Sequence, residues 1–410
     1  MSERIKARTL QFSKWGWFVL IFFMVFCTDS ALVNTNMDRT WARISWVLIL
    51  AGTLYFIPKA KFSSKDLSYL LLFSLGILAS MLYNTGFDVN SIQRIVLVWL
   101  SCAIAVSADY DIFMSQLIRF LRFIAVFSTI CVILAPVVRI LPFPELNVGN
   151  GVIYKNLLFT NVSLLSDRNY GPFWEPGAFQ LYINWAVLYE IRNKHIFKIR
   201  DIIIFAICLI TTRSTAGFLI FAIIIVYFFI NRRSEKGANT GYGQVLLIII
   251  SLAALVVFVM KSEAISGDVF DKVAVLNEGT DEINSANYST LTRIYSVPAS
   301  IEVIKSHPIF GVGIDQLKIE IFKTHEIISN TNSILSMPAT FGILPGLLYF
   351  LLFIKASFKK YRKTILNILF FVILLAMFST ENMIASLMFW TLLFYEVKLN
   401  INYYYKPENV

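Results

Sequence analysis

Long apolar segments recur through almost the whole of this 410-residue chain, and they constrain its fold more than any other feature. Hydrophobic residues make up 57% of the sequence and charged residues only 15%. A soluble domain carries about 25% charged residues, because its surface must be wetted by water. Since this chain does not meet that condition, lipid must be the solvent for most of it. The sequence therefore predicts an all-α polytopic membrane protein.

The apolar segments that are long enough to cross about 30 Å of hydrocarbon number roughly twelve. We place them at residues 15–33, 42–58, 67–84, 91–107, 117–140, 177–191, 200–213, 215–231, 244–260, 332–355, 363–379 and 383–398. The expected organisation is N-terminal transmembrane helices (1–140), a first outer loop (141–176), central transmembrane helices (177–260), a large second outer loop (261–331), C-terminal transmembrane helices (332–398) and a tail (399–410).

Basic residues determine the expected orientation of these spans. They cluster in short spacers between apolar segments, as Lys59, Lys61 and Lys65 do, whereas the short outer loops are acidic or neutral. This bias places both termini in the cytoplasm. The same clustering accounts for the formal net charge of +10, so we expect membrane lipids and no nucleic acid as partners.

The sequence offers no convincing metal site. Asp109 and Asp111 form a DxD pattern, but the pattern is short and lies in a predicted inner loop. No other acidic pair is well spaced for a divalent cation, and the outer segments are rich in arginine instead. The four cysteines all lie inside apolar segments without CxxC spacing, which is typical of core residues. We therefore expect a metal-free site and no cofactor.

The segment Arg168-Asn-Tyr-Gly-Pro-Phe-Trp-Glu-Pro-Gly leads directly into an expected span. Pro176 suits the first position of a helix, which makes Glu175 its N-cap. Glu175 is then either a plain capping carboxylate beside an interfacial Trp174 or a functional carboxylate at the membrane surface. In the second case the helix N-terminus keeps Glu175 ionised, as a base requires, and Trp174 gives a nearby sugar an aromatic platform.

Two arginines are expected at the outer surface. Arg213 lies in Thr-Thr-Arg-Ser-Thr-Ala-Gly (211–217), which joins two expected spans with almost no loop. It either snorkels to the lipid headgroups or binds a phosphate, since its planar fork matches phosphate oxygens. Arg293 begins a segment, 293–306, whose apolar residues recur every three or four positions, as in an amphipathic helix at a membrane surface. An exposed cation on such a helix usually meets only headgroups.

Polar residues also gather before the span expected at 332–355. His307-Pro-Ile-Phe-Gly-Val-Gly predicts a glycine-containing turn and not a nucleotide-binding loop, because the strand–turn–helix setting is missing. His325 is either a loop histidine or a general base, since a neutral imidazole accepts a proton near pH 7. Asn330 and Asn332 follow it closely and are candidates for substrate contact.

Taken together, these motifs resemble the O-antigen polymerase/ligase superfamily, in particular the Wzy-type O-antigen or capsule polysaccharide polymerases. The resemblance covers about residues 165–350, and the order of the motifs and the large late loop carry it. The motifs are Arg-x-x-Gly-x-x-x-Glu-Pro-Gly (168–177), Thr-Arg-Ser-Thr-x-Gly (212–217), Thr-Arg…His-Pro-Ile-Phe-Gly-Val-Gly (292–313) and Asn-Ser-Ile-Leu…Phe-Gly-Ile-Leu-Pro-Gly (332–346).

The resemblance implies a membrane glycosyltransferase of the GT-C-like class in the bacterial inner membrane, with its active site facing the periplasm. Such an enzyme polymerises undecaprenyl-pyrophosphate-linked oligosaccharides by inverting, metal-independent transfer, alongside a chain-length regulator and a flippase. In this family, arginines of the outer loops bind the pyrophosphate. The resemblance implies this role for Arg213 and Arg293, with Arg168 as an additional candidate. Together with the residue patterns described above, the candidate catalytic residues are Glu175, His325, Arg213 and Arg293, with either Glu175 or His325 as the base. The candidate substrate-binding residues are Arg168, Tyr170, Trp174, Asn330 and Asn332.

Two alternatives remain open. The ligase branch of the superfamily, which transfers polymer to the lipid A core, usually has a His-Asn pair before the late span. Here the corresponding pair is Thr331-Asn332 and the nearest histidine is His325, which favours a polymerase. A transporter or polysaccharide flippase would show repeated halves and broken or charged helices at the bilayer midplane, and the sequence indicates neither.

Overall fold

The computed structural model describes residues 12–33, 39–84, 88–147, 153–157, 159–192, 198–235, 285–325, 327, 330–358 and 364–402. The span expected at 244–260 lies outside the described residues, as does the part of the second outer loop before residue 285. The chain divides into two compact units. The first comprises residues 1–70, 93–214 and 385–410, and the second comprises residues 71–92 and 215–384.

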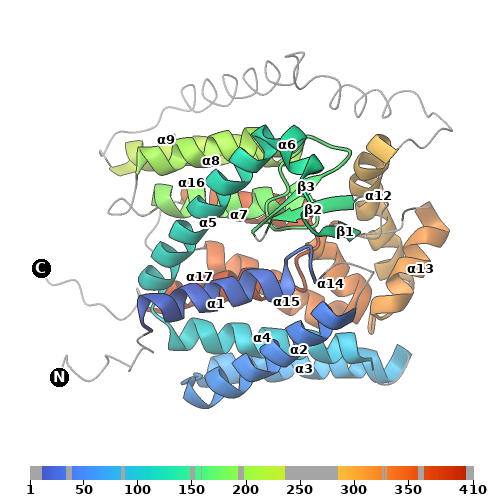
Figure 1. The fold of residues 1–410 in the computed structure, drawn as a ribbon. Helices are drawn as coiled ribbons and strands as arrows, with labels where there is room; N and C mark the ends of the chain where they lie inside the picture. The colour runs from blue at the N-terminus through green and yellow to red at the C-terminus, as the bar shows by residue number, and fades with distance from the viewer. Residues whose placement is uncertain are drawn as a thin grey trace, which may run out of the picture. The chain divides into compact units, whose positions relative to one another are not determined.

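The first unit is a set of packed helices that carries a small β-sheet (Figure 1). Its central helix α5 (Tyr110–Ile133) contacts α1 (Lys14–Thr28), α7 (Pro176–Arg192) and α8 (Ile199–Thr212). Helix α1 also packs on α2 (Arg39–Phe56) and α17 (Leu387–Asn402). Two further helices, α3 (Ser64–Asn84) and α4 (Val89–Ser107), have residues in both units.

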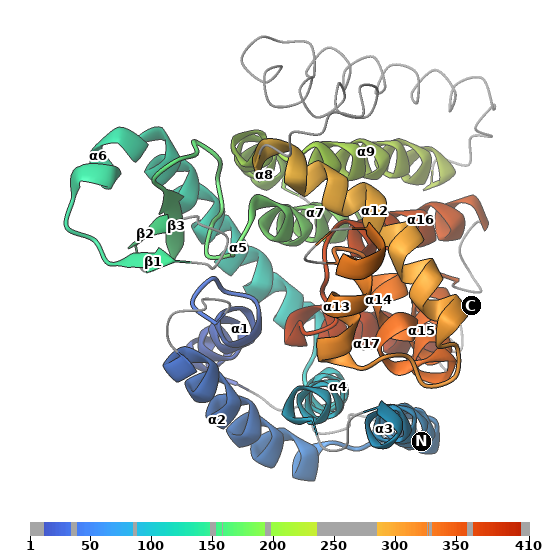
Figure 2. The ribbon, with the colours of Figure 1, turned by 90° about the vertical axis from the view of Figure 1, so that its right-hand side faces the viewer.

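The sheet lies in the segment 141–176, for which the sequence predicts only a loop. After α6 (Ala135–Ile140), the strands β1 (Glu145–Asn147), β2 (Ile153–Leu157) and β3 (Thr160–Ser163) pair antiparallel in the order β1-β2-β3. Strand β3 packs on α5 and α6, as Figure 2 shows, with Val138 and Val162 in a shared apolar cluster. Strands of three to five residues are too short to give a period-two pattern, and the sequence therefore did not reveal them.

The second unit contains helices joined by turns, and no strand, among its described residues. Helices α12 (Ser285–Ser306), α13 (Ile314–His325) and α14 (Ser333–Phe341) pack on one another (Figure 1). Val303, Leu317 and Ile321 are buried in their common core. Helix α15 (Ile343–Ser357) packs on α16 (Thr364–Thr380), and α16 contacts α9 (Thr215–Glu235).

The segment expected as one span at 332–355 consists of two helices, because the chain breaks at Gly342. Gly342 has φ 84°, and a Cβ atom at this position would lie 1.9 Å from the carbonyl oxygen of Ile309. The N–H of Ile343 donates to the carbonyl of Pro308 at 2.9 Å. The span expected at 332–355 is therefore not one continuous helix.

The turn at 307–313 packs against the chain at Gly342 and forms hydrogen bonds with the backbone on both sides of it. Gly311 and Gly313 have φ 64° and 81°, which only glycine adopts without strain, and they confirm the predicted glycine turn. The N–H of Gly313 donates to the carbonyl of Thr340 at 2.8 Å, and a Cβ on Gly311 would lie 2.4 Å from the same oxygen. The motifs at 307–313 and 332–346 thus pack directly against each other, backbone to backbone.

Five helices among the described residues are long and apolar enough to cross a membrane. They are Thr40–Lys59, Ser64–Asn84, Val89–Ser107, Tyr110–Ile133 and Thr215–Arg232. Three further apolar helices, at Trp15–Thr28, Ile343–Ser357 and Thr364–Thr380, are shorter. These helices agree with the expected spans in position and support a membrane protein.

The amphipathic helix expected at 293–306 forms the second half of α12. Ser296, Ala299 and Val303 lie on its buried side, whereas Val297 and Ile301 are each 39% exposed. Of the expected apolar stripe, Ile304 packs against the core of the unit, and Val297 and Ile301 do not form part of it. Its contact with a membrane surface stays a prediction.

A buried ion pair joins α7 to α17 in the first unit. The Nη1 and Nη2 atoms of Arg192 donate to the two carboxylate oxygens of Glu396 at 2.7 and 2.9 Å. The Tyr110 hydroxyl donates to the same carboxylate at 2.9 Å. The side chains of Arg192 and Glu396 are only 8% and 1% exposed, so these contacts replace the water that both charges lose on burial.

Removal of Glu396 should destabilise the protein strongly. Glu396→Ala deprives a buried guanidinium of its two-oxygen partner, a change that costs about 3–5 kcal/mol. Thermal unfolding of the purified protein in detergent would show this as a clearly lower Tm. The matched control is Lys323→Ala, which breaks a 2.8 Å pair with Glu320 in which the lysine is 60% exposed. The control should change stability by less than about 1 kcal/mol, and equal losses in the two variants would contradict the assignment.

Candidate functional site

The turn between α8 and α9 holds Arg213 in a left-handed conformation. Its φ of 49° is the only positive φ of a non-glycine residue in the described part of the chain. Its N–H closes the last turn of α8 on the carbonyl of Ile210 at 3.1 Å, and α9 begins at Thr215. Glycine normally takes this position at the end of a helix, and another residue costs about 1 kcal/mol. This strained position motivates the hypothesis that the arginine side chain has a role of its own.

The side chain of Arg168 binds the same helix end. Its Nε atom donates to the carbonyl of Thr212 at 3.2 Å, and its Nη2 atom donates to the carbonyl of Arg213 at 3.4 Å. The last carbonyls of a helix lack partners within the helix and carry partial negative charge, so a cation is stabilising there. Two of the predicted substrate-site arginines therefore meet at one helix end of the first unit.

Asn169 links the segment before α7 to α8 and α5 through hydrogen bonds. It is completely buried, its N–H donates to the carbonyl of Thr211 at 2.8 Å, and its amide donates to the hydroxyls of Ser128 and Thr211 at 3.1 and 2.9 Å. Its Oδ1 atom accepts the N–H of Gly171 at 3.0 Å. The sequence analysis did not single out Asn169. An asparagine two residues before a glycine is typical of an Asx turn, and that signal was available.

Tyr154 of β2 is a second residue that the sequence analysis missed. Its hydroxyl donates to the carbonyl of Trp174 at 2.8 Å, and its ring centroid lies 4.8 Å from that of Tyr170. Burial raises the pKa of the Tyr154 phenol well above its usual range, and the nearby Tyr170 and Glu175 side chains add to the rise. Tyr154 therefore keeps its proton and serves as a neutral donor among the predicted site residues.

Glu175 holds the helix-capping position that the sequence predicts. Helix α7 begins at Pro176, and the carbonyl of Glu175 accepts the N–H of Phe179 at 3.4 Å. The side chains of Trp174 and Glu175 are both partly exposed. The first unit thus brings Arg168, Tyr170, Trp174, Glu175 and Arg213 into one region around the end of α8 and the start of α7.

The second unit brings His325 beside two residues of α12. His325 is the last residue of α13, and its Nδ1 atom lies 3.8 Å from Oε2 of Glu302. The ring of Tyr295 lies 5.7 Å from the imidazole, measured between centroids. At 3.8 Å the Glu302 carboxylate is not hydrogen-bonded to Nδ1, but its negative charge would stabilise the imidazolium that forms when the ring takes a proton. This geometry suits a general base.

The segment after His325 is fastened to the same helix. The amide of Asn330 donates to the Ser300 hydroxyl at 2.7 Å, and the N–H of Thr331 donates to the Ser296 hydroxyl at 3.2 Å. Position 293 lies one turn before Ser296 and two turns before Ser300, which places Arg293 on the same face of α12 by its backbone position.

Asn332 caps α14. Its Oδ1 atom accepts the N–H groups of Ile334 and Leu335, both at 3.0 Å, and the residue is 4% exposed. The structure gives Asn332 this capping role, and its contact with a substrate stays a prediction.

The two aspartates of the DxD pattern have local roles. Asp109 caps α5 by accepting the N–H of Ile112 at 3.0 Å. Asp111 accepts the hydroxyl of Tyr189 at 3.4 Å. Within the described residues, no group of three or more His, Cys, Asp or Glu side chains is placed to hold a metal ion.

The comparison with known families covers both units. Residues 202–351 match the O-antigen ligase family model. The match confirms the predicted resemblance to the O-antigen polymerase/ligase superfamily, and it includes Arg213, Arg293 and His325. It covers less than half of the chain and begins after the motif at 168–177. No curated protein matches the sequence. Members of this family are enzymes that act on polysaccharides, which supports a function of the ligase or polymerase type.

Tyr154→Phe should reduce activity more than stability. The variant keeps the ring but loses a neutral hydrogen bond worth about 1 kcal/mol, and this bond holds the backbone of Trp174 next to Glu175. We expect a several-fold fall in polysaccharide formed by cells that contain normal amounts of the protein. Tyr395→Phe is the matched control, because it removes a buried tyrosine bond to the carbonyl of Ala108 in the same unit. An equal fall in both variants would show that Tyr154 has only a packing role.

Proposed function

We propose that the protein polymerises undecaprenyl-pyrophosphate-linked oligosaccharides at the periplasmic face of the bacterial inner membrane. A hydroxyl of the incoming repeat unit attacks the anomeric carbon of the growing chain, and undecaprenyl pyrophosphate leaves with the bonding electron pair. The hydroxyl proton passes to a base, and the configuration at the anomeric carbon inverts. The observation that carries the proposal is the left-handed Arg213 within the region that matches the family.

Arg213 and Arg293 would stabilise the leaving pyrophosphate. Negative charge on this group grows in the transition state, so fixed guanidinium groups accelerate the reaction more than they tighten binding. Arg213 is the C-cap of α8, and this fixed backbone position limits the positions that its guanidinium can reach. Arg168 donates two of its N–H groups to helix carbonyls. It would therefore stabilise the turn in addition to contributing positive charge for the phosphate.

Two residues are candidates for the base. The Glu302 carboxylate lies 3.8 Å from Nδ1 of His325, and its charge would stabilise the imidazolium formed when the ring takes the hydroxyl proton. Glu175 lies at the start of α7, where the partial positive charge of the helix end keeps a carboxylate ionised. The pairing with Glu302 favours His325, and Glu175 would then orient the acceptor sugar together with Trp174 and Tyr170.

Arg213→Gly separates the role of the side chain from that of the backbone. Glycine takes the left-handed conformation freely and removes a strain of about 1 kcal/mol, which offsets its greater freedom in the unfolded chain. We expect a Tm equal to or above that of the wild type, together with loss of long polymer, so that cells display single repeat units. Gel analysis of surface polysaccharide beside the Tm would measure both effects. Long chains at normal protein levels in this variant would refute the proposed role of Arg213.

A ligase is the second candidate, because the matching family model is described as O-antigen ligase. A ligase transfers finished polymer to a core acceptor and does not lengthen it. Purified protein can be given lipid-linked repeat units alone, or finished lipid-linked polymer with lipid A core. We expect longer chains in the first reaction and no transfer in the second. Transfer without elongation would establish the ligase instead.

A further inference from the structure

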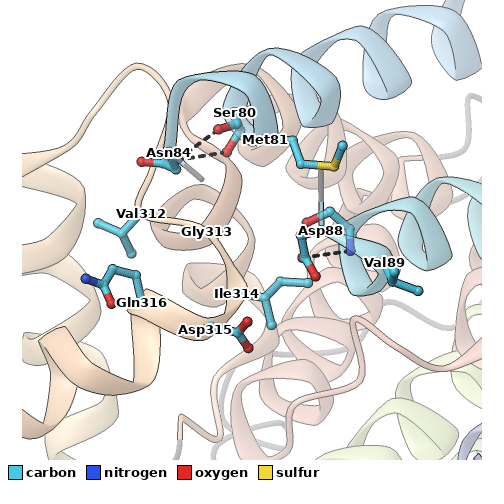
Figure 3. Close-up of a pocket in the computed structure, with 11 residues that line it drawn as sticks. Ser80, Met81, Asn84, Asp88, Val89, Val312, Gly313, Ile314, Asp315 and Gln316 are labelled. Atoms are coloured by element: carbon cyan, nitrogen blue, oxygen red, sulfur yellow. Dashed lines mark hydrogen bonds between the residues drawn. The ribbon is translucent and has the colours of Figure 1, made fainter. Parts of the chain in front are cut away.

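A pocket of about 370 Å³ with a mixed polar and apolar lining lies within the second unit. Arg213, Arg293 and His325 are not among the residues that line it. The end of α3, the start of α4 and the start of α13 surround it (Figure 3). Figure 3 shows Asn84 and Gln316 on one side of the opening, Asp88 on the other and Asp315 below. All three surrounding segments are expected on the outer face of the membrane.

Hydrogen bonds hold the walls of this pocket in place. The Ser80 hydroxyl donates to the carbonyl of Phe310 at 2.5 Å, and the Asn84 amide donates to the carbonyl of Ser80 at 3.0 Å. Asp88 caps α4 by accepting the N–H groups of Asn90 and Ser91, both at 3.0 Å. The pocket is therefore formed before any ligand binds, so a ligand meets little ordering cost.

The chemistry of the lining selects for hydroxyl groups and against phosphate. Asp88 and Asp315 offer carboxylate acceptors, and Gln316 offers an amide donor and acceptor. Asn84 offers its amide oxygen, because its Nδ2 atom donates to the carbonyls of Ser80 and Phe310. None of the residues that line this pocket is Lys, Arg or His, so its field repels an anion. Met81 supplies an apolar surface for the C–H face of a ring. The volume is near the lower end of ligand pockets, which begin at about 300 Å³, and suits one sugar unit better than a lipid tail.

We propose that this pocket is a subsite for an uncharged sugar unit of the lipid-linked glycan. The inference rests on the proposed function, which supplies the glycan as the ligand. The pocket would seat the sugar part of the substrate, while the pyrophosphate is left to the arginines. It therefore contributes to the choice of glycan and takes no part in bond breaking.

Protection of a cysteine placed in the pocket tests this subsite. Gln316→Cys, in the full-length protein in lipid nanodiscs, is modified with N-ethylmaleimide; the native cysteines are all buried. The first probe is the repeat-unit oligosaccharide released from its lipid by mild acid, and the second is inorganic pyrophosphate. We expect the oligosaccharide to slow modification at least fivefold and pyrophosphate to leave it unchanged. Lys318→Cys is the control, because it is exposed on the opposite side of α13 and outside the pocket, and neither probe should protect it.

No protection by the oligosaccharide, or equal protection by pyrophosphate, would overturn the proposal. Asp315→Asn in the Gln316→Cys background is the second variant. It should raise the oligosaccharide concentration needed for protection about tenfold, since hydrogen bonds to charged groups are the stronger ones. Protection is measured against the unprotected rate of the same variant, because loss of a neighbouring negative charge itself favours the reactive thiolate. The assay does not depend on catalysis, so Arg213→Gly should still be protected. Protection together with undiminished polymer in Arg213→Gly would remove the proposed role of Arg213 and leave the sugar subsite standing.

Discussion

The free carbonyl end of α8 is the constraint on which the first unit depends. Only Arg213 and Ser214 separate α8 from α9, so the loop itself offers few donors for the last carbonyls of the helix. The donors come from the segment that precedes α7, through the side chain of Arg168 and the backbone of Asn169. Satisfaction of this helix end therefore brings the motif at 168–177 to the turn at 212–217.

The second unit meets a similar requirement in another way. The break between α14 and α15 frees backbone groups that the turn at 307–313 satisfies, and glycine is required where the two backbones touch. Because this turn connects α12 to α13, it also fixes how those helices pack. His325 at the end of α13 then lies beside Glu302 of α12. The backbone contact between the motifs at 307–313 and 332–346 thus helps to determine where His325 lies.

The sequence predicted the features that depend on local chemistry. Apolar segments located several helices closely, such as α4 and α7, but the span expected at 117–140 covers parts of α5 and α6. Pro176 marked the start of α7, and the glycines at 311 and 313 marked a turn. It did not reveal the sheet around Tyr154, the buried amide of Asn169 or the break at Gly342. Each of these depends on a partner distant in sequence, such as Trp174, Ser128 or Ile309. A single residue carries no signal of such a partner, because the partner is chosen by packing.

The motifs that resemble the superfamily have mainly backbone roles, and this helps to separate structure from chemistry. Gly311 and Gly342 allow close approach, Asn332 caps a helix, and Pro176 starts one. None of these roles explains an arginine at position 213, where glycine would be less strained.

Electrostatics gives the two arginines at this helix end different roles in the proposed reaction. The end of α8 carries a partial negative charge of roughly half an electron, which by itself would repel a pyrophosphate. Arg168 directs its N–H groups to the carbonyls that carry this charge and so cancels it. The positive charge of Arg213 is then in excess at the turn. In the proposed reaction Arg168 would therefore neutralise the helix end as well as support phosphate binding, and Arg213 would supply the excess charge for the phosphate. A lysine in place of Arg168 lacks the planar fork that reaches two carbonyls at once.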